Sequence, residues 1–168
     1  MINNDTIELL KECNAGIKMG VSSIEDVYDK IESNDFKALL DNNKKEHQKL
    51  GSETHELLNE YHDSGKEPNP MAKGMSWIKT NVMIAMNESD NTIADLLTDG
   101  CNMGVKSLNR YLNKYEAAEE KAKNMQSGLS VLKTTLPKIS EHIYKNQKGR
   151  NQPKFLPFLN WRYQSLYL

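Results

Sequence analysis

Two Glu-His dipeptides are the residues of this chain best suited to metal chemistry. They are Glu46-His47 and Glu141-His142. Carboxylates and imidazoles are common ligands of iron, zinc and manganese. Neighbouring residues on a helix point about 100° apart, so such a dipeptide rarely holds one ion by itself. We therefore expect no metal ion, and we keep Glu46, His47, Glu141 and His142 as an alternative, non-standard metal site.

The histidines lack the spacing of a carboxylate-bridged di-metal centre. Such centres in helical bundles take Glu-x-x-His from two helices and a Glu from each of the other two. The residues three positions before the four histidines are Lys44, Ser52, Asn59 and Ile139, none of them acidic. His47 falls on an apolar stripe, and we expect it to be a hydrogen-bonded core residue.

Other catalytic patterns are also missing from the sequence. There is no glycine-rich phosphate loop, no Cys-x-x-Cys pair and no nucleophile elbow. Cys13 and Cys101 lie within helical pattern, where a cysteine usually serves as inert packing. We therefore expect no catalytic residue, no cofactor and no enzyme activity.

The charge of the chain is distributed unevenly. The formal net charge over 168 residues is -1, but residues 148–168 contain four cations and no acid, so residues 1–147 carry a net charge of -5. An acidic body without a basic stripe argues against a nucleic-acid partner. The sequence has neither the apolar run of a membrane span nor the start of a signal peptide, so we expect a cytoplasmic location.

The chain repeats part of its own sequence at an offset of 84 residues. Gly16-Ile17-Lys18-Met19-Gly20-Val21 recurs as Gly100-Cys101-Asn102-Met103-Gly104-Val105, and seven of the seventeen positions from 16 to 32 are identical. A repeat of this length predicts two similar halves that pack about a pseudo-twofold axis.

Apolar residues spaced three and four apart predict four helices. Their stripes run over residues 7–31, 36–61, 93–115 and 122–143. Asn4 or Asp5 is expected to cap the first helix, and Thr92 to begin the third, with Asp95 placed for a capping box. Turns are expected at 33–35 and near 117–118. The fourth helix is the least regular, because Pro137 removes a backbone donor.

These elements predict an all-α, four-helix bundle made of two antiparallel hairpins. Residues 1–147 form the bundle, and residues 64–90 are a long crossover with one extra helix from 71 to about 86. Residues 148–168 are a separate tail, rich in aromatic residues, that is suited to docking on a partner.

Two pairs of glycines lie in the middle of the first and third predicted helices. Each glycine inside a helix costs about 1 kcal/mol relative to alanine. Close approach of two helix backbones would offset that cost. We therefore predict that the first and third helices cross at Gly16, Gly20, Gly100 and Gly104. The alternative is that these glycines leave space for a ligand.

Several of these segments resemble a known group of proteins. Met19-Gly20-Val21, Ile84-Ala85-Met86-Asn87 and the segment 100–105 resemble uncharacterised ferritin-like proteins of Firmicutes, which are similar to bacterial ferritin-like domains of unknown function. The resemblance covers roughly residues 5–146. It implies an up-down-down-up bundle with an extra helix in the crossover, and it implies no activity and no site residues.

The sequence therefore favours a non-catalytic, ferritin-like bundle that acts through protein contacts, with a homo-oligomer or another protein as its partner. The alternative is a ferritin-like protein that binds iron, zinc or manganese at the non-standard site. A third, weaker hypothesis is a small-molecule site in the bundle core.

Overall fold

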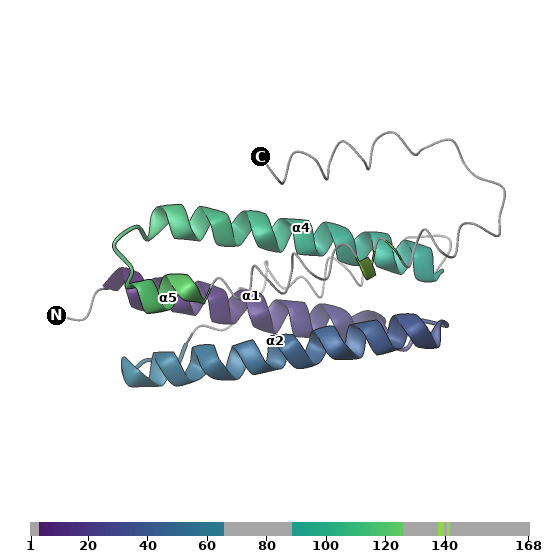
Figure 1. The fold of residues 1–168 in the computed structure, drawn as a ribbon, viewed down its shortest axis with the longest axis horizontal. Coiled ribbons are helices and arrows are strands. Elements are labelled where there is room, and N and C mark those ends of the chain that lie inside the picture. The colour runs from purple at the N-terminus through teal and green to yellow at the C-terminus, as the bar shows by residue number, and fades with distance from the viewer. Residues whose placement is uncertain (1–3, 66–88, 126–137, 140, 142–168) are drawn as a thin grey trace.

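The regular structure that the computed structural model describes is entirely helical (Figure 1). The structure describes residues 4–65, 89–125, 138–139 and 141. Within them are the helices α1 (Asn4–Tyr28), α2 (Asn34–Glu60), α4 (Asp90–Lys114) and α5 (Glu120–Asn124), and residues 138, 139 and 141 are also helical. The all-α class is thus confirmed for this part of the chain. The predicted crossover helix, Pro137, His142 and the tail 148–168 lie outside the described residues.

Serine residues cap the long helices α2 and α4. The Ser33 hydroxyl accepts a hydrogen bond from the Phe36 amide at 3.2 Å, as expected of a capping residue. Ser89 does the same for α4 by accepting from the Thr92 amide at 3.4 Å. The prediction that Thr92 begins this helix, with Asp95 in a capping box, was therefore wrong. Ser89 is the capping residue, and the helix begins at Asp90.

Helix α1 is shorter than its apolar stripe predicts. It ends at Tyr28, and the amides of Lys30 and Ile31 then donate to carbonyls three residues back. Ile31 remains buried although it lies outside the helix. The stripe extends past the helix end because burial, rather than helical geometry, requires an apolar residue here.

Helices α1 and α2 run antiparallel and side by side (Figure 1). Lys44 of α2 pairs with Glu25 of α1 at 2.6 Å. One turn further along, the Tyr28 hydroxyl donates to Asp41 at 2.9 Å. These contacts fix the register of the predicted first hairpin.

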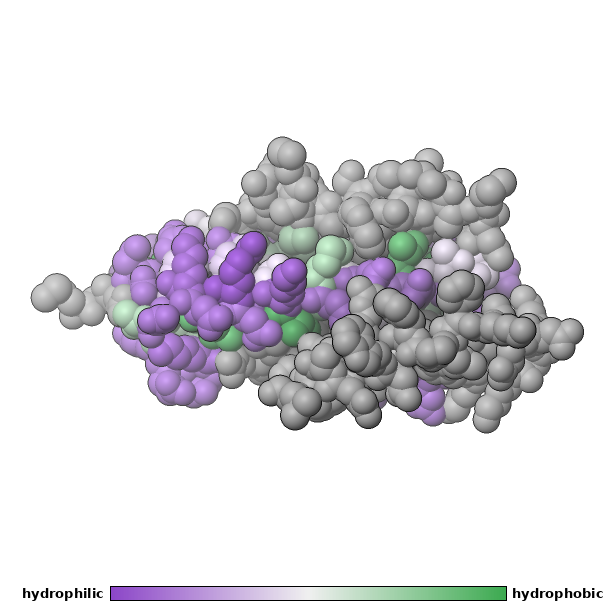
Figure 2. All heavy atoms as spheres, turned by 90° about the horizontal axis from the view of Figure 1, so that it is seen from above, coloured by the Kyte–Doolittle hydropathy of each residue, from purple (hydrophilic) through white to green (hydrophobic). Residues whose placement is uncertain are grey.

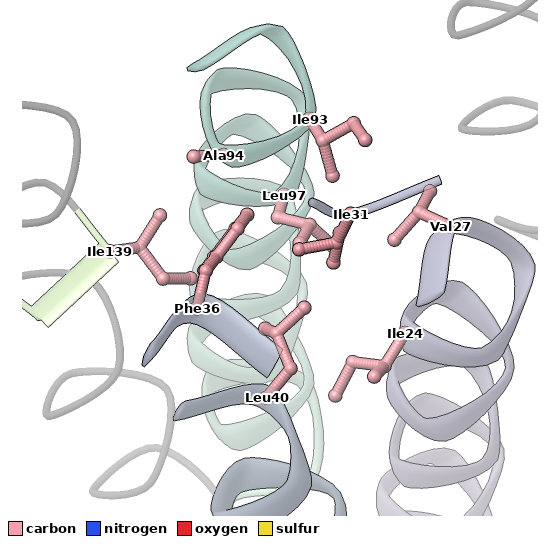
Figure 3. Close-up of a cluster of buried hydrophobic side chains, with 9 residues drawn as sticks. All are labelled: Ile24, Val27, Ile31, Phe36, Leu40, Ile93, Ala94, Leu97 and Ile139. Atoms are coloured by element: carbon pink, nitrogen blue, oxygen red, sulfur yellow. The ribbon is translucent and has the colours of Figure 1, made fainter. Parts of the chain in front are cut away.

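The core consists of two apolar clusters. One lies around the α1–α2 connection and is drawn in Figure 3; its members are Ile24, Val27, Ile31, Phe36, Leu40, Ile93, Ala94, Leu97 and Ile139. The other lies toward the start of α1 and contains Leu9, Leu10, Cys13, Leu57, Leu58, Tyr115, Ala118 and Ala122. Each cluster draws on residues from both halves of the chain, so burial of both clusters holds the halves together.

Two sets of hydrogen bonds, which we call the clasps, join the halves of the chain. At one clasp, the Asp90 carboxylate accepts from the backbone amides of Glu32 and Ser33 at 2.9 and 2.8 Å. At the other, Asp5 accepts from the Ala117 amide at 3.3 Å and Thr6 from the Glu119 amide at 2.9 Å.

The clasps lie at opposite ends of α1, one beside its start and the other just beyond its end. In each clasp, the acceptor is a side chain in the first turn of α1 or α4. The donors are backbone amides in the segment that follows the other of these two helices. The clasp at Asp5 and Thr6 involves the connection between α4 and α5. This connection is the turn predicted near 117–118, and the prediction is confirmed.

The described parts of the last predicted helix lie against α2. The Tyr61 hydroxyl donates to Glu119 at 2.9 Å, and Lys121 pairs with Glu60 at 2.8 Å. At the other end of α2, Ile139 points toward Phe36 (Figure 3).

The described surface is mostly hydrophilic in the view of Figure 2. Met103 is the one large apolar side chain among the described residues that is exposed, at 49%. Within the described part of the chain, no helix is both long and apolar enough to cross a bilayer.

Candidate functional site at the middle of the bundle

Buried polar residues occupy the stretch between the two apolar clusters. Asn43 and His47 of α2 are each 7% exposed, and Asn14 of α1 is 3% exposed. Asn43 uses its side-chain amide to donate to the Leu39 carbonyl of its own helix at 2.9 Å. Polar groups this deep in a core need hydrogen-bond partners, so this stretch is the candidate functional site.

His47 is held in one tautomer by its own helix. Its Nδ1 lies 2.8 Å from the Asn43 carbonyl oxygen, which can only accept, so Nδ1 carries the hydrogen. The other ring nitrogen, Nε2, is then unprotonated. Burial lowers the pKa of His47, and the hydrogen bond to Asn43 and the charge of Glu46 only partly oppose that effect. The ring is therefore neutral at pH 7.

Gly20 of α1 provides the space for this ring. A Cβ built on Gly20 would lie 2.8 Å from Cδ2 and 3.0 Å from Nε2 of His47, closer than carbon atoms pack. The edge of the imidazole thus rests against the α1 backbone. The close neighbour of Gly20 is thus a side chain of α2 and not the backbone of α4.

The predicted helix crossing is therefore wrong for the first glycine pair. A Cβ on Gly16 would meet nothing within 4 Å, and Gly16 is exposed. Gly16 and Gly20 are four residues apart, but only Gly20 faces a close neighbour. Gly100 and Gly104 of α4 are half-buried.

The described members of the alternative metal site lie apart. His47 is buried, whereas Glu46 and Glu141 are both exposed. Ile139, two residues before Glu141, packs on Phe36, which precedes Glu46 by ten residues of helix, or about 15 Å at 1.5 Å per residue. His142 lies outside the described residues. Throughout the described ranges, no three His, Cys, Asp or Glu side chains gather as a metal site would require.

The two cysteines are protonated thiols. Burial raises the pKa of Cys13 to about 11 and that of Cys101 to about 12. Because the thiolate is the reactive form, both side chains are poor nucleophiles and poor metal ligands at neutral pH. Their chemistry matches the packing role that the sequence predicts.

Asn14 and Gly65 form a contact that the sequence did not indicate. Gly65 follows α2 with φ of 82°, and a Cβ on it would lie 2.5 Å from the Asn14 Nδ2. That buried Nδ2 has no hydrogen-bond partner among the residues that the structure describes. In the sequence this glycine falls in the predicted crossover 64–90, and no local pattern links it to residue 14. The clasp residues Asp5, Thr6 and Asp90 were missed for the same reason, since their partners are remote in sequence.

The chemistry available to this arrangement comes from the His47 ring. An unprotonated imidazole nitrogen can accept a proton or bind a metal, but among the described residues His47 belongs to no group of three metal-ligand side chains, and its ring lies against the helix backbone. No protein-family model, curated protein or solved structure matches this chain, so the family suggested by its Met-Gly segments stays a prediction.

Proposed function

We propose that this chain is a non-catalytic, ferritin-like four-helix bundle that acts through protein contacts. Its two halves are the hairpin α1–α2 and a second hairpin that begins with α4 and α5. The family, the role and the absence of catalysis are all parts of this proposal.

The clasps support the two-hairpin architecture. Positions 6 and 90 are equivalent under the 84-residue offset, and so are positions 33 and 117. Asp90 accepts from Ser33, whereas Thr6 accepts from Glu119 and Ala117 donates to Asp5, so equivalent positions take part in both clasps although their exact partners differ. Equivalent residues with reciprocal roles are expected for two similar units related by a pseudo-twofold axis.

The contacts of α2 support the fourth helix. Glu60 and Tyr61 meet residues near the start of α5, whereas Phe36 meets Ile139. An antiparallel helix from 120 to 141 beside α2 would make both sets of contacts.

The packing of His47 is the observation that carries the non-catalytic proposal. Its Nδ1 is bonded to its own helix, its ring edge is pressed on Gly20, and it is neutral. This environment suits a residue that fills a core. A catalytic or metal-binding histidine can also be oriented by a backbone carbonyl, so the distinguishing feature is the other edge of the ring, which rests on the α1 backbone at Gly20 rather than facing a substrate or an ion.

Metal analysis of tag-free protein tests this proposal against the metal-binding alternative. We expect less than stoichiometric iron, zinc and manganese, and a melting temperature that a chelator leaves unchanged. The matched variants are His47→Gln and His55→Gln, because His55 is an exposed residue of the same helix. Stoichiometric metal that is lost with His47→Gln and kept with His55→Gln would overturn the proposal.

A further inference from the structure

Three cations run along the second half of α4, and we call them the basic stripe. Lys106, Arg110 and Lys114 are all exposed and follow one another at a spacing of four residues, which places them on one face of the helix. Residues 100–115 contain no acid, because the three aspartates of α4 all lie in its first half. The expectation of a body without a basic stripe is therefore wrong for this helix, in which three acids balance three cations.

The folding of the bundle does not account for the basic stripe. Like charges four residues apart on a helix repel each other and weaken it. Among the described residues, no carboxylate lies within ion-pair distance of the three cations, and Glu12 acts on Lys114 only from farther away. The helix dipole favours a cation in the last turn, which contains Lys114 alone. Under the 84-residue offset the equivalent positions hold Ser22, Asp26 and Lys30, so the repeated architecture does not require the stripe.

Two of the cations are held over tyrosine rings. The guanidinium of Arg110 lies 5.2 Å from the centre of the Tyr111 ring, and the ammonium of Lys114 lies 4.8 Å from that of the Tyr115 ring. The Lys114 Nζ also donates to the Tyr115 hydroxyl at 3.1 Å. The two rings stack, and they belong to or pack against the apolar cluster near the start of α1. These cations are therefore restrained before a partner binds, which lowers the entropic cost of binding.

An exposed methionine extends the basic stripe by one turn. Met103 is 49% exposed and precedes Arg110 by seven residues, or about two turns, so the two side chains share a face. Its equivalent in the first half, Met19, is half-buried. Exposed methionines are adaptable apolar contacts and are enriched where proteins bind each other. This face of α4 thus offers one apolar contact beside three cations.

We propose that this face of α4 binds an acidic helical segment of a partner protein. The inference rests on the proposed role in protein contacts, and it adds the chemistry of the partner. Four residues of helix span about 6 Å, so carboxylates at the same spacing on a second helix would meet Lys106, Arg110 and Lys114 in register. An apolar residue three positions beyond the last of these acids would cover Met103.

A nucleic acid fits this face less well than an acidic helix does. Tight binding of DNA commonly uses about 6–10 phosphate contacts, and the basic stripe provides three cations. The exposed acids Glu116, Glu119 and Glu120 follow α4 directly, so they would repel a long polyanion that ran past Lys114. A chain of phosphates also makes no apolar contact with Met103.

Binding of a synthetic peptide to the full chain tests the proposal. The peptide has about 18 residues, long enough to form a helix. It carries three glutamates spaced four residues apart, a leucine three positions beyond the last glutamate, and alanine and glutamine elsewhere. The control peptide has the same composition, with its glutamates spread around the helix. Fluorescence anisotropy of the labelled peptides measures the Kd, and the patterned peptide should bind at least threefold more tightly than the control.

Charge reversal on two helices shows where the peptide binds. The test variant combines Lys106→Glu with Arg110→Glu. The matched control combines Lys45→Glu with Lys49→Glu, which reverses two exposed lysines four residues apart on α2. We expect the test variant to weaken binding at least tenfold and the control to change the Kd less than twofold. Lys106→Gln with Arg110→Gln should give a smaller loss in the same direction, and circular dichroism checks that each variant is folded.

The outcomes that would refute an acidic partner are distinct. Equal binding by the test and control variants, equal binding of the two peptides, or no saturable binding at about 1 mM peptide would each overturn the proposal. Tighter binding of a single-stranded oligonucleotide of the same charge would assign the face to nucleic acid. Self-association that is lost only in the test variant would assign it to a second copy. None of these results changes the metal content, so the non-catalytic role stands or falls by its own test.

Discussion

Replacing Gly16 and Gly20 with alanine, one at a time, should change stability in opposite directions. An alanine inside a helix gains about 1 kcal/mol over glycine. At Gly16 the new methyl group meets nothing within 4 Å, so Gly16→Ala should raise the free energy of unfolding by about 1 kcal/mol. This is the reverse of what a close helix crossing at this residue would give.

At Gly20 the same substitution brings a methyl group to 2.8 Å from the His47 ring. The ring cannot turn away cheaply, because its Nδ1 is bonded to the Asn43 carbonyl. Overpacking of this kind costs about 1–3 kcal/mol. After the helical gain is subtracted, Gly20→Ala should be neutral or destabilising by up to about 2 kcal/mol. The two variants should then differ by about 1–3 kcal/mol.

Urea unfolding followed by far-ultraviolet circular dichroism measures both effects. For a chain of this size, 1 kcal/mol corresponds to a shift of about 2–4 °C in melting temperature. A double-mutant cycle identifies the cause, because in a His47→Ala background Gly20→Ala should become stabilising. If Gly16→Ala destabilises the protein, or if Gly20→Ala is equally harmful without the His47 ring, the assignment of each glycine to its neighbour is incorrect.

Three further predictions concern the helix ends and the buried histidine. His62 has φ of 58° at the end of α2, where its amide donates to the Asn59 carbonyl and the Asp63 amide donates to the Leu58 carbonyl. Because glycine adopts this backbone conformation without strain, His62→Gly should raise the free energy of unfolding by about 1 kcal/mol. His55→Gly, inside the helix, should lower it by ~0.4 kcal/mol, and urea unfolding measures both changes. Asp90→Ala removes a carboxylate that accepts hydrogen bonds from two backbone amides, and it should lower the free energy of unfolding by about 2–3 kcal/mol. The control is Asp35→Ala, which removes an exposed acid in the first turn of α2. An equal loss from both variants would show that the clasp contributes nothing. Burial lowers the pKa of His47, so as the pH falls the unfolded chain binds a proton at this residue before the folded protein does. The contribution of His47 to stability is therefore present above pH 6.5 and decreases as the pH falls below that value. Between pH 6.5 and 5.5 the loss should be at most about 1.4 kcal/mol, and it should vanish in His47→Gln when unfolding is measured at both pH values.

The helices could be predicted from local pattern because the buried face of each helix is marked by apolar residues at a spacing of three and four. Asn43, His47 and Thr54 fall on the apolar stripe of α2, and all three are buried. Ser33 follows the stripe of α1 and precedes that of α2, and it caps the second helix. Spacing alone was enough for these assignments, since one face of each helix packs on the rest of the chain.

The partners of the glycines could not be predicted in the same way. A four-residue spacing puts Gly16 and Gly20 near each other on one helix, but it does not say which neighbour each one meets. Contacts between elements decide that, and here the neighbour of Gly20 is His47, a residue assigned to the core for a different reason. The two Glu-His dipeptides mislead similarly, because they look alike yet differ by 95 positions, not by the 84 of the repeat. The repeat aligns Glu141 and His142 with Leu57 and Leu58, so the two dipeptides are not equivalent positions.

The clasps show how two halves of a chain can keep similar contacts while their sequences diverge. Position 6 is a threonine and position 90 an aspartate, yet both accept a backbone hydrogen bond from the other half. The donors, Glu119 to Thr6 and Ser33 to Asp90, are backbone amides, which every residue except proline provides. Thr6 supplies one acceptor oxygen to one amide, whereas Asp90 supplies two oxygens to two amides. The seven identities between residues 16–32 and 100–116 therefore underestimate how alike the halves are. By the same reasoning, relatives of this chain would be recognised by the spacing of acceptors and glycines better than by residue identity.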